Sequence, residues 1–393
     1  MPVIERPILL TGATGFVGMA VLARLLAAGH EVHCLVRAAD DAEADSRLRA
    51  VLERVQAPAT GRAVAIAGDL TAPRLGLGDR HDDIASRVGT VIHSAASVAF
   101  DLPIEEARAI NVEGTQRVLD FAGAVPGLQR VTYVSTAYVA GNRRGTAYED
   151  DRETGPFRNT YERSKHEAEA LVRSSTLPWT IARPSIVVGE STTGWTASFN
   201  VLYGPLRAFD AGAYPLLPAR RRSPVDVVPI DYVADAVAAL AHHPDAAGGT
   251  FHLTAGAQTS SVGEIMKMAT GRFDRPAPRL VPPRAYRRFL HPLILRRAAP
   301  STRRMLERSE VYFPYFAMRL RFDDARSRAL LEPMGIAPAP LGDYFGRIIE
   351  FARAARWGKR PLDRAAAVEL AGASSDVRTP VLRPSLGAAA MPA

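Results

Sequence analysis

The stretch Thr11-Gly12-Ala13-Thr14-Gly15-Phe16-Val17-Gly18 follows directly on the short apolar run Pro7-Ile8-Leu9-Leu10. Glycines at this spacing permit a tight turn and let a pyrophosphate approach the backbone closely. Apolar residues then recur at helical spacing as far as Gly29, which is expected to cap the end of a helix. The backbone amides at the start of that helix would point toward the phosphates. Strand, turn and helix therefore predict a dinucleotide-binding unit, in which the cofactor contacts Gly12, Thr14, Gly15, Phe16, Val17 and Gly18.

The identity of the cofactor depends on the end of the second predicted strand, residues 31–36. In dinucleotide-binding folds a carboxylate at this point holds the adenosine ribose of NAD. Val36 occupies that place here, and Arg37 follows it. A guanidinium pairs with a ribose 2′-phosphate, whereas a carboxylate repels it, so the sequence favours NADP. Asp40 and Asp41 lie close enough to keep NAD as the alternative.

Three further apolar runs predict strands at residues 64–70, 90–93 and 131–134. Ligands bind at the carboxyl edge of a parallel sheet, so the residues that follow each strand are candidates for cofactor contacts. Asp69 and Leu70 are expected near the adenine, and a loop-capping role for Asp69 is the alternative. The small side chains of Ser94, Ala95 and Ala96 would let the cofactor lie against the backbone.

Acid–base chemistry is indicated by Asn159-Thr160-Tyr161-Glu162-Arg163-Ser164-Lys165. Tyr161 and Lys165 lie one turn apart on a predicted helix and share a face. A lysine ammonium favours the phenolate, so we expect Lys165 to lower the pKa of Tyr161, which would then exchange a proton with a carbonyl oxygen. Ser135 and Thr136 end the fifth strand at the same edge. Their hydroxyls would hold the substrate carbonyl, and turn capping is the alternative.

Taken in this order, the motifs resemble the extended short-chain dehydrogenase/reductases over residues 8 to about 269. The resemblance implies that Thr136, with Ser135 beside it, orients the carbonyl and that Tyr161 donates the proton. It implies that Lys165 also binds the nicotinamide ribose. Asn111, a polar residue in a predicted apolar helix at 104–125, would anchor a water-linked proton relay. The loop 183–189 would place four residues beside the nicotinamide: Pro184, Ser185, Ile186 and Val187.

A narrower resemblance is to the fatty acyl-CoA reductase and thioester reductase branch, the male-sterility-type NAD-binding proteins. It is carried by residues 93–100, 111–115, 133–138, 193–195, 203–205 and 225–233. In that branch NADPH reduces an acyl thioester of coenzyme A or acyl carrier protein to an aldehyde, and sometimes onward to an alcohol. The alternatives are a hydroxysteroid or nucleotide-sugar dehydrogenase or epimerase, and a non-catalytic NADP-sensing regulator. The Tyr161 and Lys165 pair argues against the regulator.

The expected fold is α/β, a Rossmann-like doubly wound parallel sheet with a smaller, mostly helical C-terminal substrate-binding region. We assign residues 1–189 and 224–259 to the NADP-binding domain, 190–223 and 260–360 to a substrate-binding lid, and 361–393 to a mobile tail. Aromatic side chains of the lid are expected to form core or to line an acyl channel. They are Trp195, Phe199, Tyr203, Phe209, Phe313, Tyr315 and Phe316.

The formal net charge of +8 is concentrated in residues 284–308, where eight arginines face the single acid Glu307. Apolar residues between the arginines predict a basic amphipathic surface. It is either a solvated helix face or a site for an anionic partner: coenzyme A phosphates, an acidic acyl carrier protein or an anionic membrane surface. Nucleic acid is not expected, because no nucleic-acid-reading module accompanies the charge.

The single cysteine, Cys34, excludes an intramolecular disulfide, and its apolar neighbours predict a buried strand thiol. The sequence shows no apolar run long enough to cross a bilayer and no cleavable leader. We therefore expect a cytoplasmic protein, with peripheral membrane association through the arginines as an option. No metal site is expected, and the oligomeric state is not indicated.

Overall fold

A seven-stranded parallel sheet forms the centre of the computed structural model, which describes residues 6–57, 62–152, 154–199, 201–212, 216–297, 299, 303–304, 307 and 310–373. The strand order is β12-β7-β5-β4-β1-β2-β3. The strands are β1 (Ile8–Thr11), β2 (Glu31–Arg37), β3 (Arg62–Gly68), β4 (Thr90–His93), β5 (Arg130–Val134), β7 (Trp179–Pro184) and β12 (Thr250–Leu253). The chain reverses direction across the sheet between β1 and β4, as in a doubly wound fold. The predicted fold class is confirmed.

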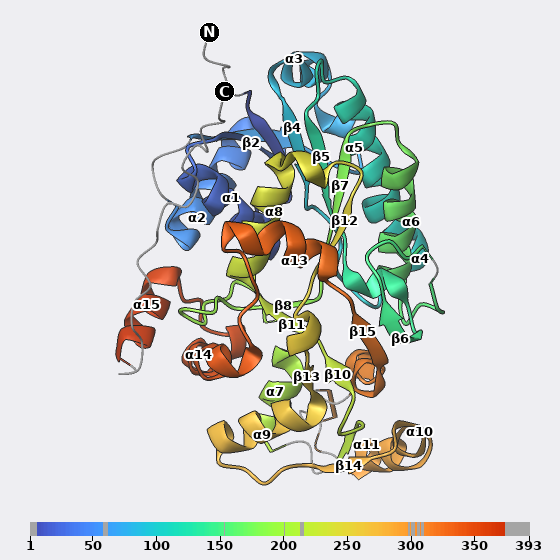
Figure 1. The fold of residues 1–393 in the computed structure, drawn as a ribbon. Helices are drawn as coiled ribbons and strands as arrows, with labels where there is room; N and C mark the ends of the chain where they lie inside the picture. The colour runs from blue at the N-terminus through green and yellow to red at the C-terminus, as the bar shows by residue number, and fades with distance from the viewer. Residues whose placement is uncertain are drawn as a thin grey trace.

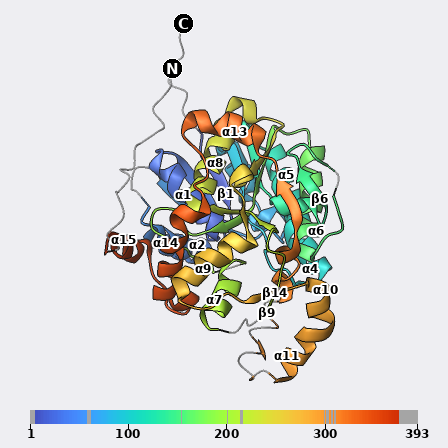
Figure 2. The same cartoon turned by 60° about the horizontal axis from the view of Figure 1, so that its bottom comes forward.

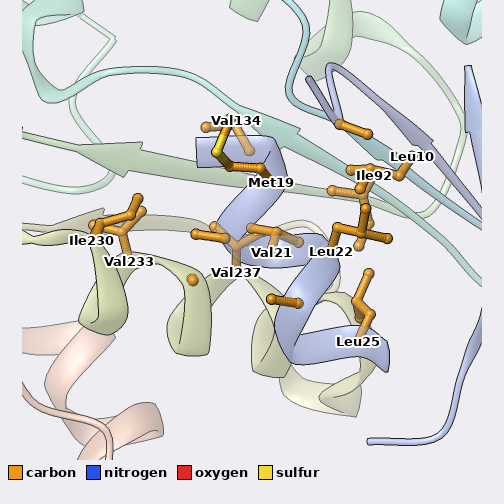
Figure 3. Close-up of a cluster of buried hydrophobic side chains, with 14 of the residues drawn as sticks. Leu10, Met19, Val21, Leu22, Leu25, Ile92, Val134, Ile230, Val233 and Val237 are labelled. Carbon is orange, nitrogen blue, oxygen red and sulfur yellow. The ribbon is translucent and has the colours of Figure 1, made fainter. Parts of the chain in front are cut away.

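Helices cover both faces of this sheet (Figure 1). One face carries α1 (Phe16–Ala27), α2 (Asp41–Val55) and α8 (Ile230–His242), and the other carries α3 (Arg80–Arg87), α5 (Gly114–Gly123) and α6 (Thr160–Ser174). Val21 and Leu22 of α1 meet Val237 of α8 in the fully buried cluster that Figure 3 shows. Each such side chain contributes about 1.5–3 kcal/mol by leaving water, so this contact fixes α1 and the turn before it.

The helix predicted at 104–125 is interrupted at its centre. It consists of α4 (Ile104–Arg108), a π-helical turn at Ala109–Glu113 and then α5. Such turns insert one residue into a helix and change the direction in which a side chain points. Here the residue at the middle of the turn is Asn111.

The lid packs around a second apolar cluster, below the sheet in Figure 1. Its helices are α7 (Tyr203–Asp210), α9 (Val262–Phe273), α10 (Pro283–Ala285), a π-helical turn at Tyr286–Leu290, α11 (His291–Arg297) and α14 (Leu341–Ala354). Short strands pair β9 (Leu216–Pro218) with β14 (Arg279–Val281), β10 (Pro224–Val225) with β13 (Ser260–Ser261), and β8 (Ile186–Val188) with β11 (Val227–Pro229). Figures 1 and 2 both place α10 and α11 at the end of the molecule away from β2 and β3.

Two segments depart from the predicted domain boundaries. Within the range assigned to the lid, β15 (Arg319–Phe322) pairs with β6 (Arg144–Ala147), and α13 (Ala325–Leu331) packs on β12 of the central sheet.

The stretch 183–189, expected as a loop, is the end of β7 followed by β8. Short 3₁₀ turns occur at 73–76, 137–140, 244–246, 256–258, 310–312, 315–317, 332–334 and 356–358.

Part of the segment assigned to a mobile tail is a helix, α15 (Arg364–Ala373). Ala367 is fully buried in the main apolar cluster, and Arg364 Nε lies 2.7 Å from Glu190 Oε1. The prediction of a mobile tail was therefore wrong for residues 364–373. This helix is rich in alanine, so its buried face is not clearly more apolar than the rest and could not be recognised from the sequence. Residues 374–393 lie outside the described residues.

Cys34 lies in the middle of β2 and is fully buried, as predicted. Burial raises the pKa of its thiol to about 12. Among the helices described, none is both long and apolar enough to cross a membrane. The described residues also contain no group of three or more His, Cys, Asp or Glu that could hold a metal ion.

Candidate active site

The glycine turn between β1 and α1 requires its glycines. Gly12 has a φ of +77°, and a Cβ on it would lie 2.6 Å from the backbone nitrogen of Ala95. A Cβ on Gly18 would lie 2.0 Å from the carbonyl oxygen of Gly12. The first helical turn has no acidic residue, and Gly15 provides no side-chain cap. The amides of Phe16 and Val17 can therefore donate hydrogen bonds to an anion bound there. These residues fit a dinucleotide phosphate.

The loop after β4 lies directly against this turn. The backbone amides of Ser94 and Ala95 donate to the carbonyl and hydroxyl oxygens of Thr11, each at 3.3 Å. The close approach of Gly12 to Ala95 brings the two loops together at the point where the strand order reverses. Doubly wound proteins bind their ligands at this point. The structure therefore brings Ser94 and Ala95 against the glycine turn, and the contact of these residues and Ala96 with the cofactor stays a prediction.

The residues that bear on the choice of cofactor differ in whether their side chains already have partners. Arg37 is exposed at the carboxyl end of β2. Asp40 instead caps α2 by accepting a hydrogen bond of 2.8 Å from the amide of Glu43. Asp41 accepts from the amide of Ala67 at 2.9 Å and pairs with Arg80 at 2.6 Å. Both acids that kept NAD as an alternative thus already have partners.

Asp69 takes the capping role that the sequence left as its alternative. Its Oδ1 accepts hydrogen bonds from the amide and the hydroxyl of Thr71, at 2.8 and 2.7 Å. The next carbonyl, that of Leu70, accepts from Arg117 at 3.2 Å. Both residues stand at the carboxyl end of β3, and the carboxylate of Asp69 is committed to its own loop.

Tyr161 lies in the first turn of α6, which begins there because Asn159 Oδ1 accepts the amide of Glu162 at 2.9 Å. A side-chain hydrogen bond joins Tyr161 to Thr136, whose hydroxyl also donates to the carbonyl of Pro184 at 3.3 Å. Burial raises the pKa of Tyr161 to about 12, against the lowering effect of Thr136. The expectation of a lowered pKa was therefore wrong. At neutral pH the phenol is protonated and can donate.

Lys165 is buried one turn further along α6. Its ammonium donates a 2.8 Å hydrogen bond to the carbonyl of Val134 and lies 4.2 Å from the centre of the Tyr133 ring. Burial lowers the pKa of Lys165 to about 7, although the charge of Glu169 acts in the opposite direction. Lys165 is thus held at the end of β5, and its charge is not among the causes of the Tyr161 pKa shift.

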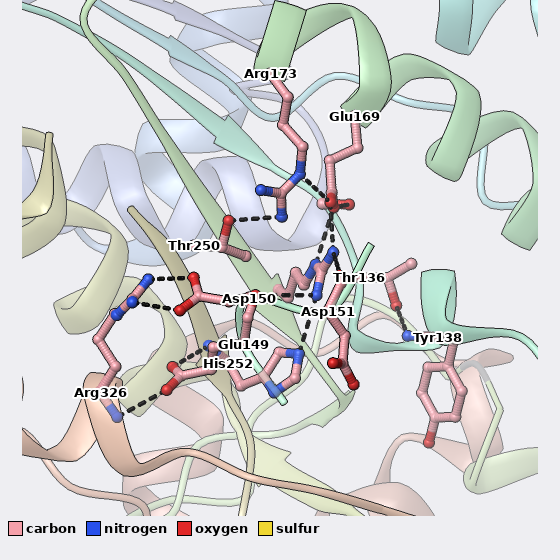
Figure 4. Close-up of polar contacts among 12 residues, drawn as sticks. Thr136, Tyr138, Glu149, Asp150, Asp151, Glu169, Arg173, Thr250, His252 and Arg326 are labelled. Carbon is pink, nitrogen blue, oxygen red and sulfur yellow. Dashed lines mark hydrogen bonds and ion pairs between the residues drawn. The ribbon is translucent and has the colours of Figure 1, made fainter. Parts of the chain in front are cut away.

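Ser135 belongs to a buried ionic network around Glu169, part of which Figure 4 shows. Its hydroxyl donates to Glu169 at 2.8 Å, and Glu169 also accepts from Arg183 at 2.5 and 3.0 Å and from Arg173 at 3.1 Å. Burial acts to raise the pKa of Glu169, but the charge and hydrogen bonds of Arg183 prevail and lower it to about 2. The sequence grouped Ser135 with Thr136, and only the structure separates their roles.

Asn111 fixes the loop after β4 to α6. Its side chain accepts from the amide of Ser97 at 2.7 Å and donates to the carbonyl of Ser97 at 3.0 Å and to the hydroxyl of Ser164 at 2.9 Å. Ser164 in turn donates to the carbonyl of Tyr161 at 3.1 Å. The side chain of Asn111 therefore positions the segment around Tyr161. A role of Asn111 in a proton relay stays a prediction.

His93, which the sequence reasoning did not select, connects the same elements. Its ring nitrogens lie 2.7 Å from the hydroxyl of Thr11 and 3.0 Å from that of Thr115. Thr115 donates to the carbonyl of Asn111 at 2.6 Å. Burial, assisted by the charge of Lys165, lowers the pKa of His93 to about 3, so the ring is neutral. Its position at the end of a strand was the available signal.

Phe100 is the second residue that was missed, although it lies in a quoted motif. Its ring stacks on Tyr161 and on Tyr315 of the lid, with 5.6 Å between ring centres in each case. The hydroxyl of Tyr315 donates to Glu162 at 2.7 Å and accepts from Asn159 at 2.8 Å. The lid is thereby attached to the turn of α6 that carries Tyr161.

A glycine turn at the reversal point of a doubly wound sheet, with a tyrosine and a lysine one helical turn apart beside it, defines an extended short-chain dehydrogenase/reductase. Residues 10–237 match the family model described as male sterility protein, and the chain belongs to this family of NAD-binding proteins. The predicted family is confirmed.

Solved structures and curated proteins agree with this assignment. The terminal R domain from the myxalamid PKS-NRPS biosynthetic pathway is 26% identical with a TM-score of 0.79, over 92% of this chain and 94% of that one. The non-canonical nonribosomal peptide synthetase FrzA of Cladobotryum sp is 32% identical over 77% of this chain and 30% of its own length. The putative fatty acyl-CoA reductase CG8303 of Drosophila melanogaster is 28% identical over 58% of this chain and 50% of its own length. The chain thus spans half or less of these two relatives.

Proposed function

We propose that this protein uses NADPH to reduce an acyl thioester, or the corresponding aldehyde, to an aldehyde or alcohol. The observation that carries the proposal is the hydrogen bond between Thr136 and the protonated Tyr161, at the sheet edge that also bears the glycine turn. Relatives described as an aldehyde reductase of Aspergillus flavus and as fatty acyl-CoA reductases of Drosophila melanogaster support the substrate class.

The residues at this edge account for the protons of the reaction. Thr136 and Tyr161 hold the carbonyl oxygen of the substrate, and bound NADPH supplies a hydride to the carbonyl carbon. As negative charge develops on the oxygen, Tyr161 donates its hydroxyl proton to it and Thr136 stabilises the charge. The resulting hemithioacetal breaks its carbon–sulfur bond, and its hydroxyl proton passes to the departing thiolate. An aldehyde and a free thiol remain, and Tyr161 regains its proton from solvent.

The cofactor preference rests on the end of β2. Arg37 is the exposed cation there, whereas Asp40 and Asp41 are engaged with α2 and β3. A 2′-phosphate therefore meets a guanidinium without competing for it with a nearby free carboxylate. Lys165, on the face of α6 shared with Tyr161, is assigned to the nicotinamide ribose. Pro184 and the following residues 185–187 are assigned to the nicotinamide ring.

The thiol carrier is expected to meet the arginine helix, which we define as residues 283–297. Tyr286 and His291 are buried on its inner side, where both rings contact Phe313. Phe289 and Leu293 are exposed on the outer side, together with four arginines: Arg287, Arg288, Arg296 and Arg297. This surface is complementary to an acidic acyl carrier protein. Coenzyme A phosphates and anionic lipid share the required charge.

Neutralising these four arginines to glutamine tests the assignment. We expect a higher KM for an acyl carrier protein thioester and an unchanged KM for a fatty aldehyde, which has no anionic carrier. Arg49→Gln, at an exposed position on α2, is the control. An increase confined to acyl-CoA would assign the site to coenzyme A, and loss of sedimentation with phosphatidylserine vesicles would assign it to a membrane. No change in any assay would leave a solvated helix face.

The proposed function is tested with one substrate panel. Purified protein is given NADPH or NADH with acyl-CoAs or fatty aldehydes, and NADP⁺ or NAD⁺ with a hydroxysteroid or a UDP-sugar, and the absorbance of the reduced cofactor is followed. We expect NADPH oxidation with thioesters or aldehydes only, and its loss in Tyr161→Phe with NADPH binding retained. Turnover of the steroid or sugar alone would support the alternative substrates. Full activity of Tyr161→Phe would contradict the mechanism.

A further inference from the structure

The lid encloses an apolar cavity of about 70 Å³ between α7, α9 and β9. Leu206 and Phe209 of α7, Ile265 and Ala269 of α9 and Leu217 of β9 are among its walls. Each of the described residues that line it has a hydrocarbon or thioether side chain. Water inside such a space would have no hydrogen-bond partner, so the cavity suits a hydrocarbon ligand.

A second, smaller cavity of about 20 Å³ adjoins the first. Tyr138, Tyr312 and Tyr315 contribute to its walls. Three further residues line both cavities and form the partition between them: Leu202, Val225 and Phe316. The two cavities therefore lie side by side.

Tyr138 and Tyr315 connect the smaller cavity to the candidate catalytic hydroxyls. Tyr138 donates its amide hydrogen to the hydroxyl of Thr136 at 3.3 Å, and its ring meets that of Tyr315 edge-on at 5.4 Å. Phe100 stacks between Tyr315 and Tyr161. A continuous series of aromatic rings thus runs from the proton donor to the cavity, and a substrate whose carbonyl contacts Tyr161 can extend its chain along it.

The larger cavity of about 300 Å³ elsewhere in the described chain has the opposite chemistry. It lies beside α6, and charged side chains contribute to its walls: Asp151, Arg152, Glu169, Arg173 and Arg183. A hydrocarbon chain placed there would desolvate these groups without replacing their hydrogen bonds. The smaller apolar space in the lid is therefore the better acyl site.

We propose that the two apolar cavities together bind the acyl chain of the substrate, and that Phe316 and Ala269 set its length. The proposal rests on the proposed function and names the substrate of that site. Phe316 is part of the partition, and Ala269 lines only the deeper section. A methylene group is about as large as a water molecule, about 30 Å³, so the two cavities hold roughly three methylene groups, the end of an acyl chain whose carbonyl contacts Tyr161.

Substitutions at these two positions are expected to change chain preference in opposite directions. Wild-type protein and each variant are assayed with butanoyl-CoA, octanoyl-CoA and hexadecanoyl-CoA. Ala269→Leu fills the deeper section and should raise the KM for octanoyl-CoA about tenfold, as expected for two lost methylene contacts, without affecting butanoyl-CoA. Phe316→Ala opens the partition and should raise the ratio of kcat/KM for hexadecanoyl-CoA to that for octanoyl-CoA by about the same factor. Ala354→Leu, on α14 and lining neither cavity, is the control.

A binding assay separates the acyl site from the activity. Octanoate, as the probe, is titrated into each variant in a calorimeter, and thermal unfolding shows which variants are folded. Ala269→Val is the milder replacement if Ala269→Leu does not fold. If the wild type is active and the variants have the same chain preference and the same probe affinity as the wild type, the acyl site is overturned. A wild type inactive on every thioester and aldehyde, with probe binding still sensitive to Ala269, would overturn the proposed function alone.

Discussion

Tyr315 of the lid donates a 2.7 Å hydrogen bond to Glu162, the residue that follows Tyr161 in the sequence. Glu162 is fully buried and also pairs with Arg158 at 3.0 Å. The contact joins positions 153 residues apart, and it attaches the lid to the first turn of α6. The helical turn that carries Tyr161 is therefore positioned partly by the lid.

Tyr315→Phe should weaken this attachment while leaving the ring against Phe100. Removing a donor to a buried carboxylate costs about 1–3 kcal/mol in the free energy of unfolding, which thermal or urea denaturation measures. We expect a higher KM for the acyl substrate and an unchanged chain preference. Tyr148→Phe, at an exposed tyrosine, is the matched control and should change neither quantity. Equal effects of the two substitutions would argue against the attachment.

Thr136 and Ser135 are predicted to behave differently although they are adjacent. Thr136→Val removes the hydroxyl that is hydrogen-bonded to Tyr161 and should lower kcat by about 10²–10³-fold, because the oxyanion loses a stabilising group. Ser135→Ala removes a donor to Glu169 and should leave kcat within a few-fold of wild type while lowering the free energy of unfolding by about 1–3 kcal/mol. Steady-state kinetics and denaturation on both variants decide the matter. A larger kinetic effect at Ser135 would reverse the assignment.

Arg37→Ala is predicted to affect one cofactor and not the other. Loss of a charge-assisted contact to the 2′-phosphate corresponds to an increase of about ten- to a hundredfold in the KM for NADPH. The KM for NADH should not change, because NADH lacks that phosphate. Arg49→Ala, an exposed arginine paired with Asp45 on the neighbouring helix α2, should affect neither cofactor. Parallel changes for both cofactors would place Arg37 outside the phosphate site.

Glu169 is predicted to make stability depend on acid pH. Its pKa in the folded protein is about 2, below the ordinary 4.5, so the stability that it contributes is fully present above pH 4.5 and is lost as the pH falls toward 2. Glu169→Gln leaves Arg183 and Arg173 without their buried partner and should cost about 3–5 kcal/mol at pH 7. Urea denaturation should show this difference shrinking between pH 4.5 and 2. Glu332→Gln, in an exposed pair with Arg328, should cost at most about 1 kcal/mol.

Local patterns predicted the elements that local interactions determine. The glycine turn from Gly12 to Gly18 and the strands around it follow from steric and apolar patterns within a few residues, and all were found. The pKa of Tyr161 could not be predicted in this way, because its burial depends on Phe100 and on the lid around Tyr315. Ser135 and Thr136 follow the end of β5 and their hydroxyls contact different partners, so adjacency in the sequence could not show that only Thr136 meets Tyr161.

The interior position of Cys34 has a practical consequence for every experiment above. It is the sole cysteine of the 393-residue chain and is fully buried, with a thiol whose pKa burial raises to about 12. The folded protein therefore has negligible thiolate at neutral pH and reacts slowly with maleimides. A cysteine introduced at Phe289 could carry a fluorescent reporter on an otherwise silent background. Carrier contact, lid motion and chain entry can then be followed in real time without first removing a native thiol.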